Sequence, residues 1–389
     1  MPKPKLIRMT TVPISLEKLL EGQLAYMSNY FDVIAISAEM EKLEAYGNRE
    51  GVRTFHVELT RKITPIKDIL AVFKLYKFLK KENPAIVHTH TPKAGIVGMM
   101  AAWLAGVPNR LHTVAGLPLM EATGLKRKVL NFVEKLTYRF ATKVYPNSKG
   151  LYDFIIAKNF SKAPKLSIIG NGSSNGIDTD YFNPIRFSES DNISLRDKWK
   201  IPQDNFLFIF VGRLVKDKGI NELTAAFSKL SESKNKISLL LVGPFENDLD
   251  PLLPETLVNI EQNPNIYSVG YQNDVRPFFT IADALAFPSY REGFPNVVMQ
   301  AGAMGLPSIV TDINGCNEII IHRVNGLIIS PKNSEALANA MRLLMEDKNL
   351  YQQLQGNARA QITNRFEQQQ VWDALLEEYQ RLLKQKSRK

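Results

Sequence analysis

The chain has 389 residues, 44% of them hydrophobic and 23% charged, a composition typical of globular proteins and a length that predicts two domains rather than one core. Its single cysteine, Cys316, excludes an intramolecular disulfide, and the lack of a signal-peptide-like start or of about 18 consecutive apolar residues indicates a soluble or peripheral cytoplasmic protein. The net charge of +10 lies in the first half, where residues 1–185 hold 26 Lys and Arg against 15 Asp and Glu, so we expect an anionic partner.

The first half alternates short apolar runs with amphipathic segments, the pattern of a parallel sheet with crossover helices. A helix is expected at Ile69–Leu79. Residues 170–184, GNGSSNGIDTDYFNP, are rich in Gly, Ser and Asn and predict a linker, so the first domain is expected to span 1–184. The strands expected before this linker are Lys5–Met9, Phe31–Ser37, Val52–Leu59, Ala85–His90, Arg110–Val114, Val144–Asn147 and Leu166–Ile169.

The same pattern starts again after the linker and predicts a second α/β domain over residues 185–365. A helix is expected around Ser334–Met345, and a long periodic segment at about 366–389 predicts a terminal helix that packs back on the first domain. The strands expected in this half are Phe206–Val211, Ser238–Val242, Ile266–Val269, Ala284–Phe287, Ser308–Thr311 and Leu327–Ile329.

One candidate phosphate site follows the first strand of the second half, in FLFIFVGRLVKDKGINEL. Ligands of open α/β sheets bind at the carboxyl ends of strands, where helix N-termini offer amide groups to phosphate. Arg213 can hold phosphate oxygens with its fork of donors, and Lys218 adds a second positive charge. A surface Arg and Lys on an ordinary loop is the alternative. The chain has no P-loop pattern.

A second candidate segment is REGFPNVVMQAGAMGLPSIVTD, residues 291–312. Gly293 allows close approach of the backbone, Pro295 suits the first turn of a helix, and the amides near Asn296 would face an anion. Because Glu292 would repel phosphate, it is better suited to accept hydrogen bonds from sugar hydroxyls. Two turns later, the amide of Gln300 is able to reach a ribose.

The histidines form a third group of candidates. His88 and His90 occupy alternate positions on one strand and therefore share a face, which fits either a metal pair or hydrogen-bonding roles; we favour the second because no third ligand is near. His112 lies in the next expected strand, Arg110–Val114, and is either functional or a satisfied strand-end histidine. The Asp-x-Asp of Asp248 and Asp250 lies in a polar loop and is interpreted as a solvated turn.

Taken together, VGRLVKDKG, EGFPNVVMQAGAMGLPSIVTD, GSSNGID, VHTHTPKAG and RLHTVAGLP resemble the retaining glycosyltransferases of family 4, over essentially the whole chain. The sequence departs from that family's Glu-x7-Glu spacing at Gln300, where a second Glu is usual. The resemblance implies the GT-B architecture, two Rossmann-like doubly wound domains that face a central cleft. It also implies transfer without a metal or cofactor.

The resemblance assigns residues to three roles. It implies that Arg213 and Lys218 neutralise the donor diphosphate, that Glu292 contacts the transferred sugar, and that His112 faces this sugar; these are the expected catalytic residues. The expected donor-binding residues are Gly212, Tyr271, Gly293, Phe294, Pro295, Asn296, Val297 and Gln300, and the expected acceptor-side residues are His88, His90, Lys93 and Gly116.

The function that this resemblance implies is transfer of a sugar from a nucleoside diphosphate donor, with UDP favoured, to a lipid-linked glycan in bacterial capsule or O-antigen synthesis. The Lys- and Arg-rich segment 124–143 fits either an amphipathic helix on an anionic inner membrane face or a buried crossover helix. Nucleic acid is not expected, because no readout motif is present. The alternatives are a non-hydrolysing nucleotide-sugar epimerase and a non-catalytic nucleotide-sugar-binding module.

Overall fold

The computed structural model describes residues 2–60, 62–117, 119, 123–232, 236–246 and 250–386. The chain forms two compact units, one of Met1–Gly176 with Gln368–Lys389 and one of Ile177–Glu367. The expected boundary after residue 184 falls a few residues inside the second unit. The backbone amide of Ile177 donates to the carbonyl of Phe366 at 2.9 Å, so the chain already belongs to the second unit there.

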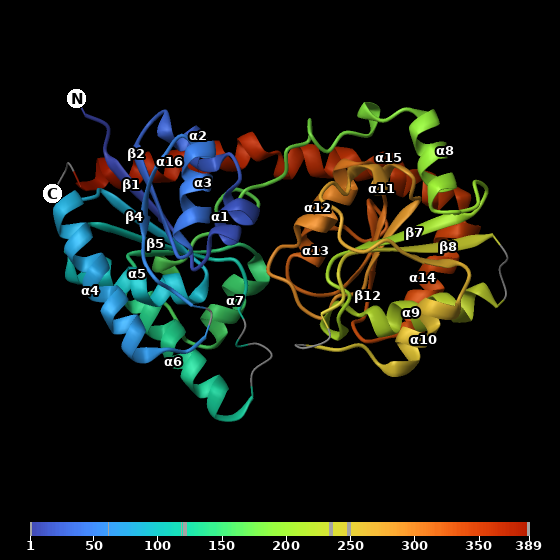
Figure 1. Ribbon diagram of the computed structural model, residues 1–389, viewed down its shortest axis with the longest axis horizontal. Helices are drawn as coiled ribbons and strands as arrows, with labels where there is room; N and C mark the ends of the chain where they lie inside the picture. The colour runs from blue at the N-terminus through green and yellow to red at the C-terminus, as the bar shows by residue number, and fades with distance from the viewer. Residues whose placement is uncertain are drawn as a thin grey trace. The chain divides into compact units, whose positions relative to one another are not determined.

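The first unit contains a parallel sheet of six strands in the order β3-β2-β1-β4-β5-β6. Helices α4, α5 and α6 lie on one side of this sheet, and α1, α2, α3 and α16 lie on the other (Figure 1). The strands are β1 Lys5–Met9, β2 Asp32–Ser37, β3 Arg53–His56, β4 Ile86–His90, β5 Asn109–Val114 and β6 Lys143–Pro146. The helices are α1 Pro13–Leu20, α2 Gln23–Ser28, α3 Met40–Glu50, α4 Pro65–Glu82, α5 Pro92–Leu104, α6 Gly124–Phe140, α7 Lys149–Ala157 and α16 Gln368–Lys386, with a 3-10 turn, η2, at Ala163–Lys165.

The expected strand at Leu166–Ile169 is wrong. Only Leu166 forms a bridge, with Val144 of β6, and the amide of Ser167 donates to the carbonyl of Val144 at 3.2 Å. The chain reaches this edge from η2 and leaves it at Gly170, whose φ of 54° turns the backbone away before a ladder forms. The expected strand Val52–Leu59 is likewise shorter, since only the four residues of β3 pair with β2.

The second unit repeats this topology, with six parallel strands in the order β12-β11-β10-β7-β8-β9. In both units the first strand lies between the second and the fourth, which is the doubly wound order. The strands are β7 Phe206–Val211, β8 Ile237–Val242, β9 Ile266–Ser268, β10 Ala284–Phe287, β11 Ser308–Thr311 and β12 Gly326–Ile329. The helices are α8 Glu189–Lys198, α9 Ile220–Ser231, α10 Pro254–Gln262, α11 Arg276–Thr280, α12 Asn296–Ala303, α13 Cys316–Ile319, α14 Ser334–Glu346 and α15 Lys348–Phe366, with 3-10 turns η3 Pro184–Arg186 and η4 Lys216–Lys218.

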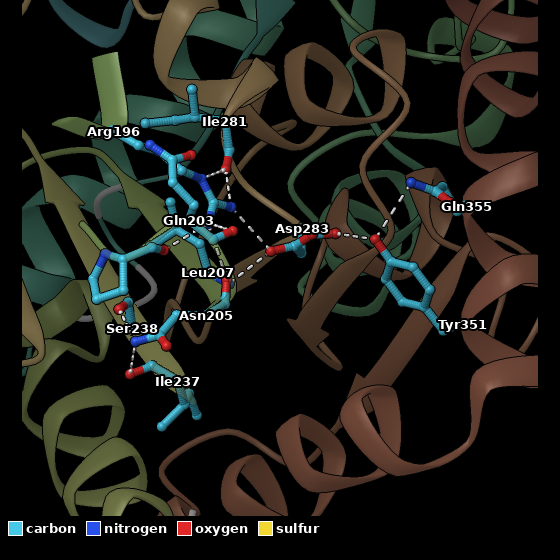
Figure 2. A network of polar contacts seen from close by, with 11 residues as sticks. Arg196, Gln203, Asn205, Leu207, Ile237, Ser238, Ile281, Asp283, Tyr351 and Gln355 are labelled. Carbon is cyan, nitrogen blue, oxygen red and sulfur yellow. Dashed lines mark hydrogen bonds and ion pairs between the residues drawn. The ribbon is translucent and has the colours of Figure 1, made fainter. Parts of the chain in front are cut away.

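A buried arginine joins α8 to the ends of the central strands in the second unit (Figure 2). Arg196 donates to the backbone carbonyls of Pro202, Asn205 and Ile281, at 3.1, 3.0 and 2.5 Å for the shortest bond to each. The carboxylate of Asp283 accepts from the amide of Leu207 at 2.7 Å, at the start of β7. These bonds fix the amino ends of β7 and β10 and leave their carboxyl ends for the site.

The C-terminal part of the chain differs in detail from the expected single helix at about 366–389. α15 ends at Phe366, and α16 begins at Gln368. α16 contributes Leu375, Tyr379 and Leu382 to the core of the first unit. No helix among the described residues is long and apolar enough to cross a membrane.

Candidate functional site

The candidate site of the second unit lies where the carboxyl ends of β7 and β10 are neighbours. The loop after β7 carries Arg213 and Lys218, and the loop after β10 carries Glu292. Gly219 has φ of 72°, and a Cβ atom there would lie 2.2 Å from the carbonyl oxygen of Pro288. Only glycine allows the two loops to approach this closely, so Gly219 brings the candidate residues together.

Both candidate phosphate-binding cations are paired with carboxylates. Lys218 Nζ lies 2.5 Å from Glu292 Oε1, and both side chains are largely buried, at 17% and 15% exposed. Arg213 Nη1 lies 2.6 Å from Glu246 Oε2, with both side chains more open to solvent. Neither of these two cations is therefore unpaired in the structure.

Glu292 is held by a further residue that the sequence analysis did not single out. The hydroxyl of Ser289 lies 2.9 Å from Glu292 Oε1, so this carboxylate oxygen receives bonds from both Ser289 and Lys218. The turn itself is fixed by Gly315, where φ is 74° and a Cβ atom would lie 2.6 Å from the carbonyl oxygen of Gly293. No spacing in the sequence indicates the bond from Ser289 to Glu292, three residues away in the same loop, or the approach of Gly315 to Gly293.

The turn leads into α12, which begins at Asn296. Pro295 is the N-cap of this helix and not part of its first turn as expected, and no side chain caps the helix. Phe294 is buried, with its ring 5.4 Å from that of Phe366. Val297 is half-buried in the first turn of α12. The buried ring of Phe294 anchors the expected donor-binding turn beside the N-terminus of this helix.

Two other expected donor-binding residues have open side chains. Gln300 is half-buried in α12, and its amide has no hydrogen-bond partner among the residues that the structure describes. Tyr271 is 65% exposed in the loop after β9. Gly212, with φ of 151°, directly follows β7 and lies so close to Gly243 that a Cβ atom on Gly243 would be 1.8 Å from the Gly212 carbonyl oxygen.

A second set of polar contacts stiffens the loop after β7. Arg291 donates to Asp217 Oδ2 at 2.8 Å, and the amide of Asp217 donates to Asp250 at 2.6 Å. Asp250 thus has a structural role, while Asp248, the other half of the Asp-x-Asp, lies outside the described residues. The described residues contain no group of three or more His, Cys, Asp and Glu that could hold a metal ion.

In the first unit, His112 lies near the end of β5 with its Nδ1 atom 2.8 Å from the hydroxyl of Thr89. Burial lowers the pKa of His112 to about 4, so the ring is neutral at neutral pH. α5 packs directly against this ring, because a Cβ atom on Gly95 would lie 2.6 Å from His112 Cε1. The side chain is therefore tightly positioned.

His88 and His90 form hydrogen bonds and stack on each other, with ring centroids 4.5 Å apart. His88 has both ring nitrogens in contact with hydroxyls, those of Tyr379 at 2.6 Å and Thr113 at 2.8 Å, so neither nitrogen is open to a metal. Of the other acceptor-side residues, Lys93 is ion-paired with Asp68 at 2.5 Å. Gly116 lies in the loop after β5.

Comparison with known proteins identifies the family. A capsular polysaccharide biosynthesis glycosyltransferase, CapM, of Staphylococcus aureus is 32% identical over 388 residues, which is 99% of each chain. The UDP-Gal:alpha-D-GlcNAc-diphosphoundecaprenol alpha-1,3-galactosyltransferase of Escherichia coli is 33% identical over 86% of this chain and 85% of its own. The sequence model of glycosyl transferases group 1 matches residues 191–361, and that of the glycosyl transferase 4-like domain matches residues 25–172. The chain belongs to this glycosyltransferase family.

Solved structures give the same fold for this glycosyltransferase. A glycosyltransferase of Rickettsia africae has a TM-score of 0.81 at 21% identity, covering 99% of this chain and all of that one. HepE of Anabaena, solved in complex with UDP and glucose, has a TM-score of 0.81 at 20% identity, covering 96% and 98%. The expected GT-B fold class is thus confirmed, and the two six-stranded parallel sheets are its two Rossmann-like domains.

Proposed function

We propose that this glycosyltransferase moves a sugar from a UDP-linked donor to a lipid-linked glycan during synthesis of a bacterial surface polysaccharide, with retention of the anomeric configuration and without a metal ion. The main support is the Lys218–Glu292 pair at the carboxyl ends of β7 and β10, because a lysine is suited to phosphate and the neighbouring carboxylate is suited to sugar hydroxyls. The Escherichia coli relative is named for a UDP-galactose donor and a diphosphoundecaprenol acceptor.

In this proposal the second unit binds the donor. Arg213 and Lys218 leave their carboxylate partners and bind the diphosphate, where they stabilise the negative charge that develops as the glycosidic bond breaks. Glu292, released from Lys218 and still held by Ser289, accepts hydrogen bonds from the transferred sugar. The unpartnered amide of Gln300 serves the ribose.

The first unit supplies the acceptor-side groups. His112 is buried, neutral and held by Thr89, so its ring is able to make directional hydrogen bonds without adding charge. His88 and His90 lie on the neighbouring strand β4. Lys93, which is ion-paired with Asp68, stays a proposed acceptor-side residue.

We also propose that the first unit docks on an anionic membrane through α4 and α6. Ile66, Leu70 and Phe73 of α4 are 78%, 64% and 57% exposed at helical spacing, which places them in one stripe. Leu125 and Phe132 of α6 are 78% and 65% exposed in a similar stripe. Both helices cover the same side of the first sheet (Figure 1).

Charge favours a lipid surface as the partner of these stripes. Lys67, Lys74 and Lys77 are exposed along α4, and Lys126 and Lys128 are exposed in the first turn of α6. Apolar side chains interleaved with lysines are the composition that lies at the interface of anionic lipids. This assigns α6 to the surface in its first half, whereas Tyr138 in its second half is fully buried in the core.

The proposal is tested by incubating the purified protein with radiolabelled nucleotide sugars and a membrane extract that contains lipid-linked glycans. We expect label from a UDP-sugar in the lipid fraction, in the donor's anomeric configuration by NMR, and unchanged by EDTA. Label in an epimer of the donor would favour the epimerase, and donor binding with no turnover would favour a binding module. Inversion, or loss of transfer in EDTA, would contradict the corresponding part of the proposal.

A further inference from the structure

A small pocket in the first unit lies at the carboxyl ends of β4, β5 and β6. Its polar lining consists of side chains from the strands and from the loop before the second unit: His88, His90, Thr113, Tyr145, Asn147, Ser173 and Ser174. No carboxylate lines it among the described residues. In doubly wound sheets, ligands bind at this end of the strands. The groups around the pocket determine which kind of ligand it suits.

A buried positive charge contacts one of the residues that line the pocket. The guanidinium of Arg8, on β1, is 0% exposed and donates to Gln23 Oε1 at 2.6 Å, His90 Nε2 at 2.8 Å and Tyr379 Oη at 3.1 Å. No carboxylate lies within ion-pair distance of Arg8 in the described part of the chain, and its Nε–H has no partner there. An arginine stays charged when it is buried, and a buried charge without an opposite charge is energetically costly. An anion bound nearby would therefore stabilise Arg8.

The bond from Arg8 fixes the proton of His90. Arginine only donates, so His90 Nε2 is an acceptor without a proton. Burial and the charge of Arg8 lower the pKa of His90 well below its usual value, so the ring is neutral and carries its proton on Nδ1. This Nδ1–H is buried and has no acceptor among the described residues.

A chain of bonds orients the hydroxyl of Thr113 in the same way. Tyr379 accepts from Arg8, and its proton goes to His88 Nδ1, its other neighbour in the described chain. Burial lowers the pKa of His88 as well, so this neutral ring carries its proton on Nε2 and donates to Thr113 Oγ1 at 2.8 Å. The hydroxyl proton of Thr113 is then left for the pocket.

The two serines add donors from the opposite wall. Ser173 Oγ accepts from the backbone amide of Gly176 at 3.0 Å, and Ser174 Oγ accepts from Asn147 Nδ2 at 2.9 Å. Neither hydroxyl proton has an acceptor among the described residues. His90, Thr113, Ser173 and Ser174 thus present hydrogen-bond donors, and a buried cation contacts one of them.

We propose that this pocket binds a phosphate group. Several donors around one small space, with Arg8 beside one of them, match an oxyanion and disfavour a cation or another donor. Because the pocket is small, one phosphate oxygen enters it and the rest of the group stays at its mouth. The phosphate comes either from free inorganic phosphate or from the diphosphate of a lipid-linked acceptor; only the second source rests on the proposed function.

The first test uses the wild-type protein with 15N-labelled histidine. We expect NMR to show His90 in the Nδ1–H form and His88 in the Nε2–H form, and titration with inorganic phosphate to shift the His90 Nδ1–H signal in a saturable way. His322, exposed in the second unit, is the internal control. A His90 signal that does not respond to phosphate, or a proton found on His90 Nε2, would overturn the proposal.

The second test compares Thr113→Val, which removes the hydroxyl, with Thr113→Ser, which keeps it. We expect phosphate affinity to fall about tenfold in the first variant and to stay near wild type in the second, since one hydrogen bond to a charged group is worth about 1.5 kcal/mol or more. Equal affinity in both folded variants would refute the site. If Thr113→Val does not fold, the wild-type titration decides.

A third comparison identifies the source of the phosphate. If the acceptor provides it, inorganic phosphate competes with a diphosphate-linked acceptor, and Thr113→Val raises the KM of that acceptor more than the KM of a phosphate-free glycoside with the same sugar. If free phosphate is the ligand, it binds without competing. The NMR titration needs no transfer activity, so failure of the proposed function would leave this site testable.

Discussion

Two cations that are expected to bind a diphosphate are already neutralised by carboxylates in the structure. Lys218 pairs with Glu292, and Arg213 pairs with Glu246. We expect Lys218→Ala and Arg213→Ala each to lower kcat/KM by about 10²-fold, the usual loss when one preorganised donor to developing negative charge is removed. Lys236→Ala is the matched control, because this lysine pairs with Asp204 on an exposed surface of the same unit. Steady-state rates near wild type in both site variants, with folding intact, would remove the diphosphate assignment.

Glu292 and Gln300 lie eight positions apart but differ in their contacts. Glu292 is bonded to Lys218 and Ser289, whereas Gln300 has no partner in the described chain. A sugar contact changes during bond breaking and a ribose contact does not, so Glu292→Gln should depress kcat strongly, while Gln300→Glu should change mainly the donor KM. Kinetics with the true donor check this pair. A gain of orders of magnitude in kcat for Gln300→Glu would show that the natural amide cripples catalysis.

At the scale of an element, the turn before α12 depends on Gly315. Gly315→Ala should destabilise the second unit and lower activity, because the new Cβ atom would lie 2.6 Å from the carbonyl oxygen of Gly293. Gly305→Ala is the matched control: φ there is also positive, at 85°, but nothing lies within 4 Å of an added Cβ atom. That control should cost about 1–2 kcal/mol of backbone strain and leave the turn in place. Thermal unfolding and donor affinity should be measured for both variants, because both carry the strain of a positive φ but only Gly315→Ala adds a clash with the Gly293 carbonyl. If both variants lost the same stability and the same donor affinity, the role of Gly315 would be contradicted.

The membrane prediction also belongs to single elements. Replacing Leu70 and Phe73 of α4, or Phe132 of α6, by Ser should reduce recovery of the protein with anionic vesicles in flotation, because these exposed side chains would no longer enter the lipid interface. Val258→Ser on α10 is the control, since Val258 is 48% exposed in the other unit. Binding should also weaken with salt, as each surface Lys or Arg contributes about 1 kcal/mol that screening reduces. Equal recovery on neutral and anionic vesicles would count against α4 and α6 as the docking surface.

The sequence predicts the bounds of helices and strands better than it predicts which strands pair and which side chains meet. β1, β7, β10 and β11 have the expected bounds, because each is a short segment that is almost entirely buried in its sheet and is bounded by polar or turn residues. β7 and β10 are wholly apolar, whereas β1 and β11 include polar residues. The run Leu166–Ile169 looks the same in sequence but meets the sheet at a single bridge, and sequence periodicity does not report whether an edge is available. Within the site, the sequence suggested Arg213, Lys218 and Glu292 as candidates by residue type and position, and their roles in donor binding stay predictions. It did not indicate Glu246, which lies in another loop, or Ser289, which lies in the same loop as Glu292, because both contacts depend on the folded backbone.

At the scale of the whole molecule, the end of the chain completes the first unit. Leu375, Leu376 and Tyr379 of α16 are buried against the side of the first sheet that carries Arg8 and His88, and the hydroxyl of Tyr379 bonds to both of these residues. Truncation after residue 367 would remove this cover and leave the guanidinium and the histidines in contact with water.

We therefore expect truncation after residue 367 to unfold the first unit while the second unit, Ile177–Glu367, keeps its structure. Calorimetry should lose one transition, and limited proteolysis should leave a protected fragment near residues 177–367. Among full-length variants, Leu376→Ala should lower the stability of the first unit by about 2–5 kcal/mol, the usual cost of deleting a buried leucine side chain. Glu377→Ala, one residue away on the exposed face of the same helix, should have little effect. The two units have separate cores, so we expect each to unfold in its own thermal transition. If Leu376→Ala shifted both transitions equally, this prediction would be wrong.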